Sequence, residues 1–207
     1  SGQFFQGSTM EQETIAKIID TLKSEGIDLV VTLPEEPTSP LTETIRRDPY
    51  FTSVTVANEN NGVALCAAAS LGGRRCIFVT GIAGLLVGTW SLAQMGVLYG
   101  IPVLIMASYR GDISDRSGVS GAQLFMFMQL GEPMLNTLRI PYRVIKKKAD
   151  LEREIRDSHF ACREYGTPLV LLETLSRVAG VELLAKFEAA NPGGSVKGRV
   201  ARAMVLD

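Results

Sequence analysis

The stretch CIFVTGIAGLLVGTWSLAQMGVLYGIPVLIMASY, from Cys76 to Tyr109, contains no charged side chain. Its length would suffice for a membrane-spanning helix, which is one interpretation of it. Glycines and a proline nevertheless divide it into CIFVT, a piece of helical length, and IPVLIMAS. The two outer pieces are apolar, rich in β-branched residues, and of strand length. We therefore favour a strand, a helix and a second strand, all buried in a parallel sheet.

Strand-length and helix-length segments alternate along most of the chain. The expected strands are 27–33, 52–57, 76–80, 101–108, 141–147 and 168–173. Helices are expected over 41–47, 62–73, 84–100, 121–138 and 151–166, after a first helix that carries Ile15, Ile18, Ile19 and Leu22 and stops at Gly26. Ser39, Asn58 and Asp150 are the expected N-caps. This alternation predicts an α/β fold with a doubly wound, mostly parallel six-stranded sheet and helices on both faces.

The composition indicates one domain. We assign it to residues 10–175, interpret 176–207 as a C-terminal helix with a flexible tail, and interpret 1–9 as an expression scar. A formal net charge of −1 provides no basic face for nucleic acid. Three cysteines without a CxxC pair are typical of a reducing compartment, which favours a cytoplasmic location. The single histidine, His159, leaves no pair for a metal site and no Ser/His/Asp triad.

Ligands of doubly wound sheets bind at the carboxyl ends of the strands. This rule selects four stretches, LPEEPTSP (33–40), ANENN (57–61), TGIAG (80–84) and SYRGD (108–112). Glu59 in the second stretch is either a helix-start acid beside a capping Asn58 or a functional carboxylate. TGIAG has the glycines of a phosphate loop but no following lysine, so a tight strand-to-helix turn is the simpler interpretation.

Three further features have structural explanations. Arg110-Gly111-Asp112 spells an adhesion tripeptide, which chance explains better in a reduced chain without a recognisable signal. Lys146, Lys147 and Lys148 are expected to form a solvated edge where a strand leaves the sheet. His159, on a helix that also carries Cys162, is expected to be structural and not catalytic.

Taken in order, ANENNGVALCAAASLGG, the next strand, TGIAG and YGIPVLIMASYRG resemble the pyrimidine-binding domain of thiamine diphosphate enzymes. The resemblance is greatest to the sulfopyruvate and phosphonopyruvate decarboxylases, in particular to the separate alpha chain of the two-subunit form. It covers about residues 10–175. Its most specific parts are the Glu59 segment and the stretch 99–111, with weaker support from GAQLFMFMQLGEPMLNTLRIPY.

The resemblance implies a catalytic role for Glu59. In these enzymes the glutamate at the strand end hydrogen-bonds N1′ of the cofactor's aminopyrimidine and favours its imino tautomer, which takes the proton from C2 of the thiazolium. An apolar site suits this role, because desolvation raises the pKa of a carboxyl group and lets it share a proton. Pro34, Thr80, Gly81 and Gly84 are expected to line the cofactor site beside Glu59.

The resemblance also implies a substrate and a partner. Arg110 and Tyr109 are expected to meet a 2-oxo acid that carries an anionic group such as a sulfonate. The family holds Mg²⁺ and the diphosphate on a second domain through a GDG motif with a later asparagine, and Gly111-Asp112-Ile113 lacks the third glycine. We therefore expect no metal ligand on this chain, and a separate beta subunit that binds diphosphate and Mg²⁺. A heterotetramer or larger assembly with two-fold symmetry is the natural arrangement.

Other functions stay open at this point. The apolar turn GIAGL favours, as an alternative, a carboligase subunit that acts on a less polar 2-oxo acid. A non-catalytic α/β interaction module would bind no cofactor and would satisfy Glu59 by a polar contact within its own chain. Segments 88–98 and 121–128 are candidates for contact between chains, although core packing would explain their apolar residues equally well.

Overall fold

The computed structural model describes residues 10–111 and 121–175, in which six parallel strands form one sheet with the order β2-β1-β3-β4-β6-β5. The strands are β1 (Leu29–Thr32), β2 (Thr52–Thr55), β3 (Cys76–Gly81), β4 (Leu104–Ser108), β5 (Tyr142–Ile145) and β6 (Leu169–Glu173). The α-helices are α1 (Gln12–Ser24), α2 (Ser39–Arg47), α3 (Glu59–Leu71), α4 (Ile82–Val87), α5 (Thr89–Ala93), α6 (Gly121–Thr137) and α7 (Leu151–Tyr165). The predicted α/β class is confirmed, and every strand pair is parallel. The predicted C-terminal helix and tail, the segment 1–9 and residues 112–120 of the Gly/Ser/Asp loop 110–121 lie outside the described residues.

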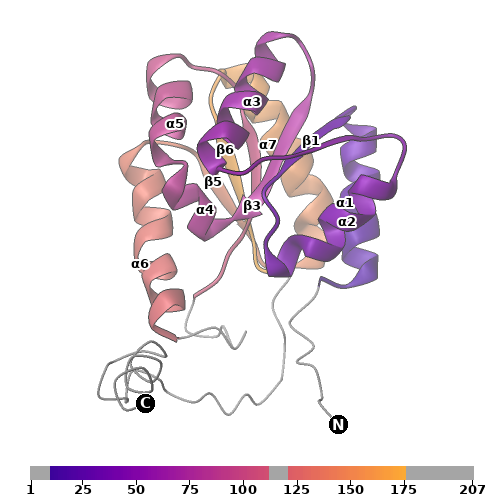
Figure 1. Ribbon diagram of the computed structural model, residues 1–207, viewed down its shortest axis with the longest axis horizontal. Coiled ribbons are helices and arrows are strands. Elements are labelled where there is room, and N and C mark those ends of the chain that lie inside the picture. The colour runs from indigo at the N-terminus through magenta and orange to yellow at the C-terminus, as the bar shows by residue number, and fades with distance from the viewer. Residues whose placement is uncertain (1–9, 112–120, 176–207) are drawn as a thin grey trace, which may run out of the picture.

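Helices cover the sheet on both faces, with α1, α2 and α7 on one and α3, α4, α5 and α6 on the other (Figure 1). Successive residues of β3 alternate between the two layers, because strand side chains point to opposite faces. Ile77 and Val79 belong to the core under α1, α2 and α7, while Phe78 belongs to the core under α3 and α4. Both cores are apolar, which explains why the central strands carry no charge.

The uncharged stretch 76–109 is divided among β3, three short helical segments and β4. No helix within residues 10–111 and 121–175 is long and apolar enough to span a bilayer. Strands β3 and β4 are buried along their whole length, whereas the edge strands β2 and β5 are partly exposed. Two-sided burial in the sheet therefore accounts for the uncharged strands β3 and β4.

The prediction of a single helix over 84–100 is wrong. Its residues form α4, α5 and a π-helical segment η2 (Gln94–Leu98), and Gly88 separates the first two. A Cβ on Gly88 would lie 3.5 Å from Cβ of Glu59. The break thus occurs where the chain passes close to the start of α3, a tertiary contact that apolar periodicity does not reveal.

Of the three expected N-caps, Asn58 and Asp150 occupy the N-cap position, and only Asn58 makes a capping hydrogen bond. Asn58 caps α3, since its Oδ1 accepts a hydrogen bond from the Asn60 backbone N–H at 2.9 Å. Ser39 is not an N-cap but the first residue of α2, and its hydroxyl donates to the Glu35 carbonyl oxygen. Asp150 occupies the N-cap position of α7 without a capping hydrogen bond, and pairs with Arg153 instead.

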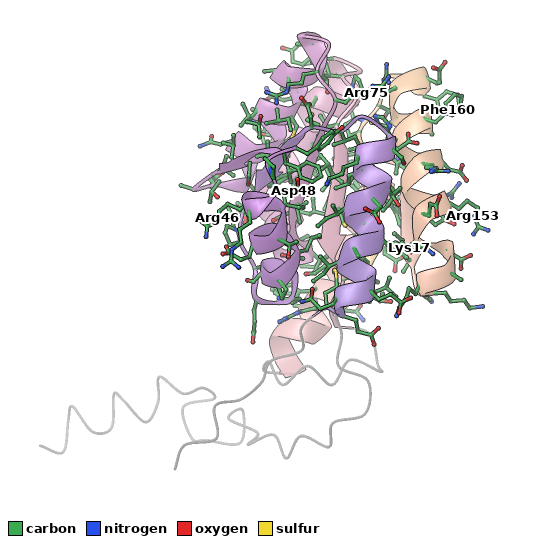
Figure 2. All side chains as sticks on the ribbon, turned by 90° about the vertical axis from the view of Figure 1, so that its right-hand side faces the viewer. Lys17, Arg46, Asp48, Arg75, Arg153 and Phe160 are labelled. Carbon is green, nitrogen blue, oxygen red and sulfur yellow. The ribbon has the colours of Figure 1, made fainter. Side chains whose placement is uncertain are left out.

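The outer face of α1 and α7 is rich in ion pairs. Arg156 pairs with Glu152 as the i,i+4 spacing predicts, and Lys148 pairs with Glu11 and Glu13 at the edge of the same layer. Figure 2 shows these two helices side by side, with Lys17 and Arg153 on the outer surface. The opposite helical layer has a different surface, with several large apolar side chains exposed.

Close packing of α3 on the sheet depends on Gly62. A Cβ on this residue would lie 2.5 Å from the ring of Phe78, which is fully buried in β3. Ala67 on the same helix is also buried, whereas Ala64 and Ala68 are exposed.

Gly62→Ala should destabilise the protein by about 1–3 kcal/mol, because the added methyl group overpacks the Phe78 contact. In an exposed helix the same change would stabilise the protein by roughly 1 kcal/mol. A loss of stability would therefore indicate the close contact with Phe78. Urea unfolding measures the effect, and Asn61→Ala on the exposed side of α3 is the matched control, expected to cost nothing. A Gly62→Ala protein at least as stable as the wild type would contradict the packing described here.

Candidate active site

The carboxyl ends of β2, β1, β3 and β4 are neighbours in the sheet, so the loops that follow them meet along one edge. These loops are the four stretches that the sequence selects. They bring two carboxylates, Glu35 and Glu59, to the turn between β3 and α4. Arg110 follows β4 at the same edge.

Glu59 is the first residue of α3 and is half-buried. Its side chain lies against α4, since a Cβ on Gly84 would lie 2.7 Å from Glu59 Oε1 and 2.5 Å from Thr80 Oγ1. Glycine at position 84 therefore leaves the space that the Glu59 carboxylate and the Thr80 hydroxyl border. Within the described residues, the Glu59 carboxylate has no hydrogen-bond or ion-pair partner.

The turn between β3 and α4 is tight. Thr80 is buried, β3 ends at Gly81, and α4 begins at the next residue, so the interpretation of TGIAG as a strand-to-helix turn is confirmed. A Cβ on Gly81 would overlap the carboxylate of Glu35. Gly81 and Gly84 thus make room for one acid each, and Pro34, expected beside them, is an exposed residue just before Glu35.

Glu35 is a residue of this site that sequence reasoning missed. It precedes the 3₁₀ turn η1 (Glu36–Thr38), and its carboxylate accepts a hydrogen bond from the Ser108 hydroxyl. Burial raises its pKa above the ordinary 4.5, against the opposing effects of the Ser108 hydrogen bond and of the Arg110 charge. The sequence LPEEPTSP does show an acidic pair after a buried strand, which is a signal for a site residue. The pattern alone does not distinguish Glu35 from its exposed neighbour Glu36.

Arg110 and Tyr109 diverge from each other. Arg110 is buried, with its guanidinium 3.9 Å from the Glu36 carboxylate, and it faces the loop after β1. The Tyr109 hydroxyl donates to Glu132 Oε1 at 2.6 Å, on α6. Glu132 also accepts a hydrogen bond from Tyr142 at 2.8 Å. Tyr109 therefore connects β4 to α6, while Arg110 stays beside Glu35.

The other titratable residues singled out in the sequence lie elsewhere. His159 is buried with its Nδ1 2.8 Å from Glu25, at the opposite edge of the sheet. Cys66, Cys76 and Cys162 are free and buried. In the part of the chain that the structure describes, no three His, Cys, Asp or Glu side chains gather as metal ligands would.

Comparison with known proteins gives a consistent result. The chain is 26% identical over 141 residues to the alpha subunit of sulfopyruvate decarboxylase from Methanococcus maripaludis, covering 68% of this chain and 82% of the relative. It is 27% identical over 146 residues to the corresponding subunit from Methanothermobacter thermautotrophicus, covering 70% and 86%. No family model matches the sequence.

The fold has a counterpart among solved structures. A 2-oxoglutarate:ferredoxin oxidoreductase from Magnetococcus marinus superposes with a TM-score of 0.62 at 17% identity, over 79% of this chain and 29% of that one. At this identity the likeness concerns the fold alone. By sequence, the chain is similar to the alpha subunits of sulfopyruvate decarboxylase, and the resemblance predicted from its motifs is confirmed.

Proposed function

We propose that this chain is the pyrimidine-binding alpha subunit of a thiamine diphosphate enzyme that decarboxylates a 2-oxo acid of the sulfopyruvate type. The observation that carries the proposal is the Glu59 carboxylate, half-buried at a strand end and without a polar partner among the described residues. A non-catalytic module would satisfy that carboxylate within its own chain. The similarity to sulfopyruvate decarboxylase alpha subunits supplies the substrate class.

The residues present fit the aminopyrimidine end of the cofactor. Glu59 offers a carboxylate oxygen to a ring nitrogen, Thr80 offers a hydroxyl, and Gly84 leaves room for both groups. When bound, thiamine diphosphate supplies the carbon nucleophile for the 2-oxo group and accepts the electron pair that CO₂ leaves behind. The chain's own contribution is to orient the ring and to hold a proton at Glu59.

Two further residues define the substrate end in this proposal. Arg110, buried beside Glu35, provides a cation for the anionic substrate. Because burial raises the pKa of Glu35, its carboxyl group opposes the binding of that anion less than an exposed carboxylate would. Mg²⁺ and the diphosphate are assigned to a beta subunit, which also fits the description of the relatives as alpha subunits.

Glu59→Gln in the assembled enzyme should lower the turnover number at least ~100-fold, because glutamine cannot exchange a proton with the aminopyrimidine. Assembly with the partner should be unchanged. The measurement is decarboxylation of sulfopyruvate by co-purified subunits, with bound thiamine diphosphate quantified after denaturation. Glu43→Gln, which removes a surface carboxylate on α2, is the control. A near-normal rate for Glu59→Gln would refute the assigned role.

Glu35→Gln should stabilise the chain in a pH-dependent manner. Because the folded-state pKa of Glu35 is raised, the native chain retains a proton that the unfolded chain releases, and stability falls as pH rises through that interval. Glutamine removes the cost of ionising the buried group and can still accept the Ser108 hydrogen bond. The difference in Tm between variant and wild type should grow from near zero at pH 4 to a maximum at pH 8. A difference independent of pH would contradict the assignment.

We propose that the beta subunit docks on the exposed apolar surface of α5 and η2, which is formed by Trp90, Val97 and Leu98. These side chains are 66–70% exposed. The surface is continuous with the site, because Asn60, next to Glu59, bonds to the Ser91 hydroxyl at 2.9 Å and to the Val87 carbonyl oxygen at 3.3 Å. It matches the segment 88–98 identified in the sequence.

Trp90→Glu should weaken association with the beta subunit by about 30-fold, the loss expected when a central aromatic contact worth ~2 kcal/mol is removed. Phe160→Glu is the matched control, since Phe160 is 63% exposed on the charged α7 face (Figure 2) and should leave the Kd unchanged. Both variants should unfold at the wild-type temperature. Equal affinities for the two variants would exclude this surface as the docking site.

A further inference from the structure

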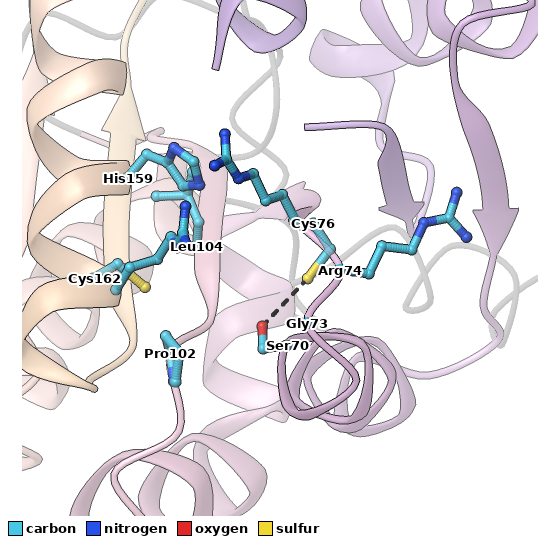
Figure 3. A pocket seen from close by; sticks show the side chains of 10 residues that line it. Ser70, Gly73, Arg74, Cys76, Pro102, Leu104, His159 and Cys162 are labelled. Carbon is cyan, nitrogen blue, oxygen red and sulfur yellow. Dashed lines mark hydrogen bonds between the residues drawn. The ribbon is translucent and has the colours of Figure 1, made fainter. Parts of the chain in front are cut away.

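A cavity of about 90 Å³ lies at the amino-terminal edge of the sheet, where β3 and β4 begin. This is the edge opposite to Glu59. Figure 3 shows His159 and Cys162 of α7 on one side of the cavity, with Ser70, Arg74 and Cys76 on the other. The proposed decarboxylation uses no residue of this cavity, so a role for the cavity is independent of that function.

The charges around the cavity are unbalanced. Three arginines line it and no carboxylate does. Arg74 is neutralised by Asp28, with two hydrogen bonds of 3.1 and 3.2 Å. Arg75 donates to the backbone carbonyl oxygen of Glu25 at 2.7 Å, which satisfies one N–H without neutralising the charge. Arg163 has no ion pair within the described residues. Two positive charges therefore border the cavity without an ion-pair partner among the described residues.

His159 adds a buried polar atom to the lining of the cavity. Its side chain is 5% exposed, and Nδ1 is 2.8 Å from Glu25 Oε2. Nε2, on the other side of the ring, has no hydrogen-bond partner among the described residues. Buried ring nitrogens are normally hydrogen-bonded, so an unpartnered one at a cavity indicates a place for a ligand or solvent atom.

The surroundings of His159 determine the pKa and the protonation state of its imidazole ring. Burial lowers the pKa of the imidazole, and the charges of Arg75 and Arg163 lower it further, while Glu25 opposes them. Arg156 lies 3.7 Å from the Glu25 carboxylate and shares that partner. Burial raises the pKa of the Cys162 thiol to about 12, so this neighbour adds no charge. The ring is consequently neutral at pH 7, with its Nδ1–H directed to Glu25 and a lone pair on Nε2.

We propose that this cavity binds a tetrahedral oxoanion of the phosphate or sulfate class, held by Arg75 and Arg163 and by a proton that His159 takes up at Nε2. The volume is enough for several water molecules, and so for one such anion. Ser70 provides a hydroxyl on the side of the cavity opposite to His159, 3.7 Å from the Cys76 thiol. An anion here would balance the two unpaired guanidinium groups and would convert His159 into an imidazolium ion between two negative charges.

The test uses the fact that His159 is the only histidine of the chain. The purified chain, labelled with ¹⁵N-histidine, is titrated at pH 7 with inorganic phosphate while sodium chloride holds the ionic strength constant. Binding should give a saturable change in the Nε2 chemical shift towards the protonated form, and the pKa of His159 should be higher at saturation. Inorganic sulfate and glycerol 3-phosphate, titrated separately, distinguish a free anion from the terminal group of a larger metabolite.

Arg163→Gln should weaken phosphate binding at least ~10-fold, the loss expected for one charge-assisted hydrogen bond. Arg153→Gln is the matched control, because Arg153 lies on the same helix but pairs with Asp150 and Glu154 away from the cavity. Its affinity for phosphate should equal that of the wild type. The proposal is overturned if the shift does not saturate, if chloride alone reproduces it, or if Arg163→Gln binds as tightly as Arg153→Gln.

Discussion

Close approach of α3 and α4 to strand β3 is the constraint on which the candidate site depends. Gly62 lets α3 rest on the ring of Phe78, and Gly84 lets α4 pass beside the first residue of α3. Interiors are packed at crystal-like density, so a methyl group at either position would push the helices apart. The position of the Glu59 carboxylate relative to Thr80 therefore depends more on having glycine at positions 62 and 84 than on any hydrogen bond.

A second consequence of this packing is that the two acids of the site have different surroundings. Glu35 is half-buried beside the β3–α4 turn, where it accepts a hydrogen bond from Ser108 and burial raises its pKa. Glu59 is also half-buried, at the start of a helix, and its carboxylate has no polar partner among the described residues. When two carboxyl groups of one site have unequal environments, they can take different roles, one in proton transfer and the other in binding.

The sequence was sufficient for the order of the elements and for the edge at which the site lies. Alternation of apolar strands and helices identifies all six strands, and the strand-end rule selects the loops that carry Glu59 and Arg110. It was not sufficient where contacts between distant segments decide the outcome. The helix break at Gly88 lies beside Glu59, and Glu35 bonds to Ser108, 73 residues later in the chain. The hydrogen bond from Tyr109 to Glu132 of α6 is another such contact, and the predicted contact of Tyr109 with substrate stays a prediction.

The unequal surfaces of the two helical layers also bear on how such a chain can be produced. The α1 and α7 layer presents ion pairs to water, whereas α5 and η2 present Trp90, Val97 and Leu98. Apolar surface of this kind associates with whatever complementary surface is nearest, including other copies of the same chain. If a partner normally covers it, synthesis of the two polypeptides in matched amounts becomes a condition for solubility, and any excess of this one would be directed to aggregation or proteolysis.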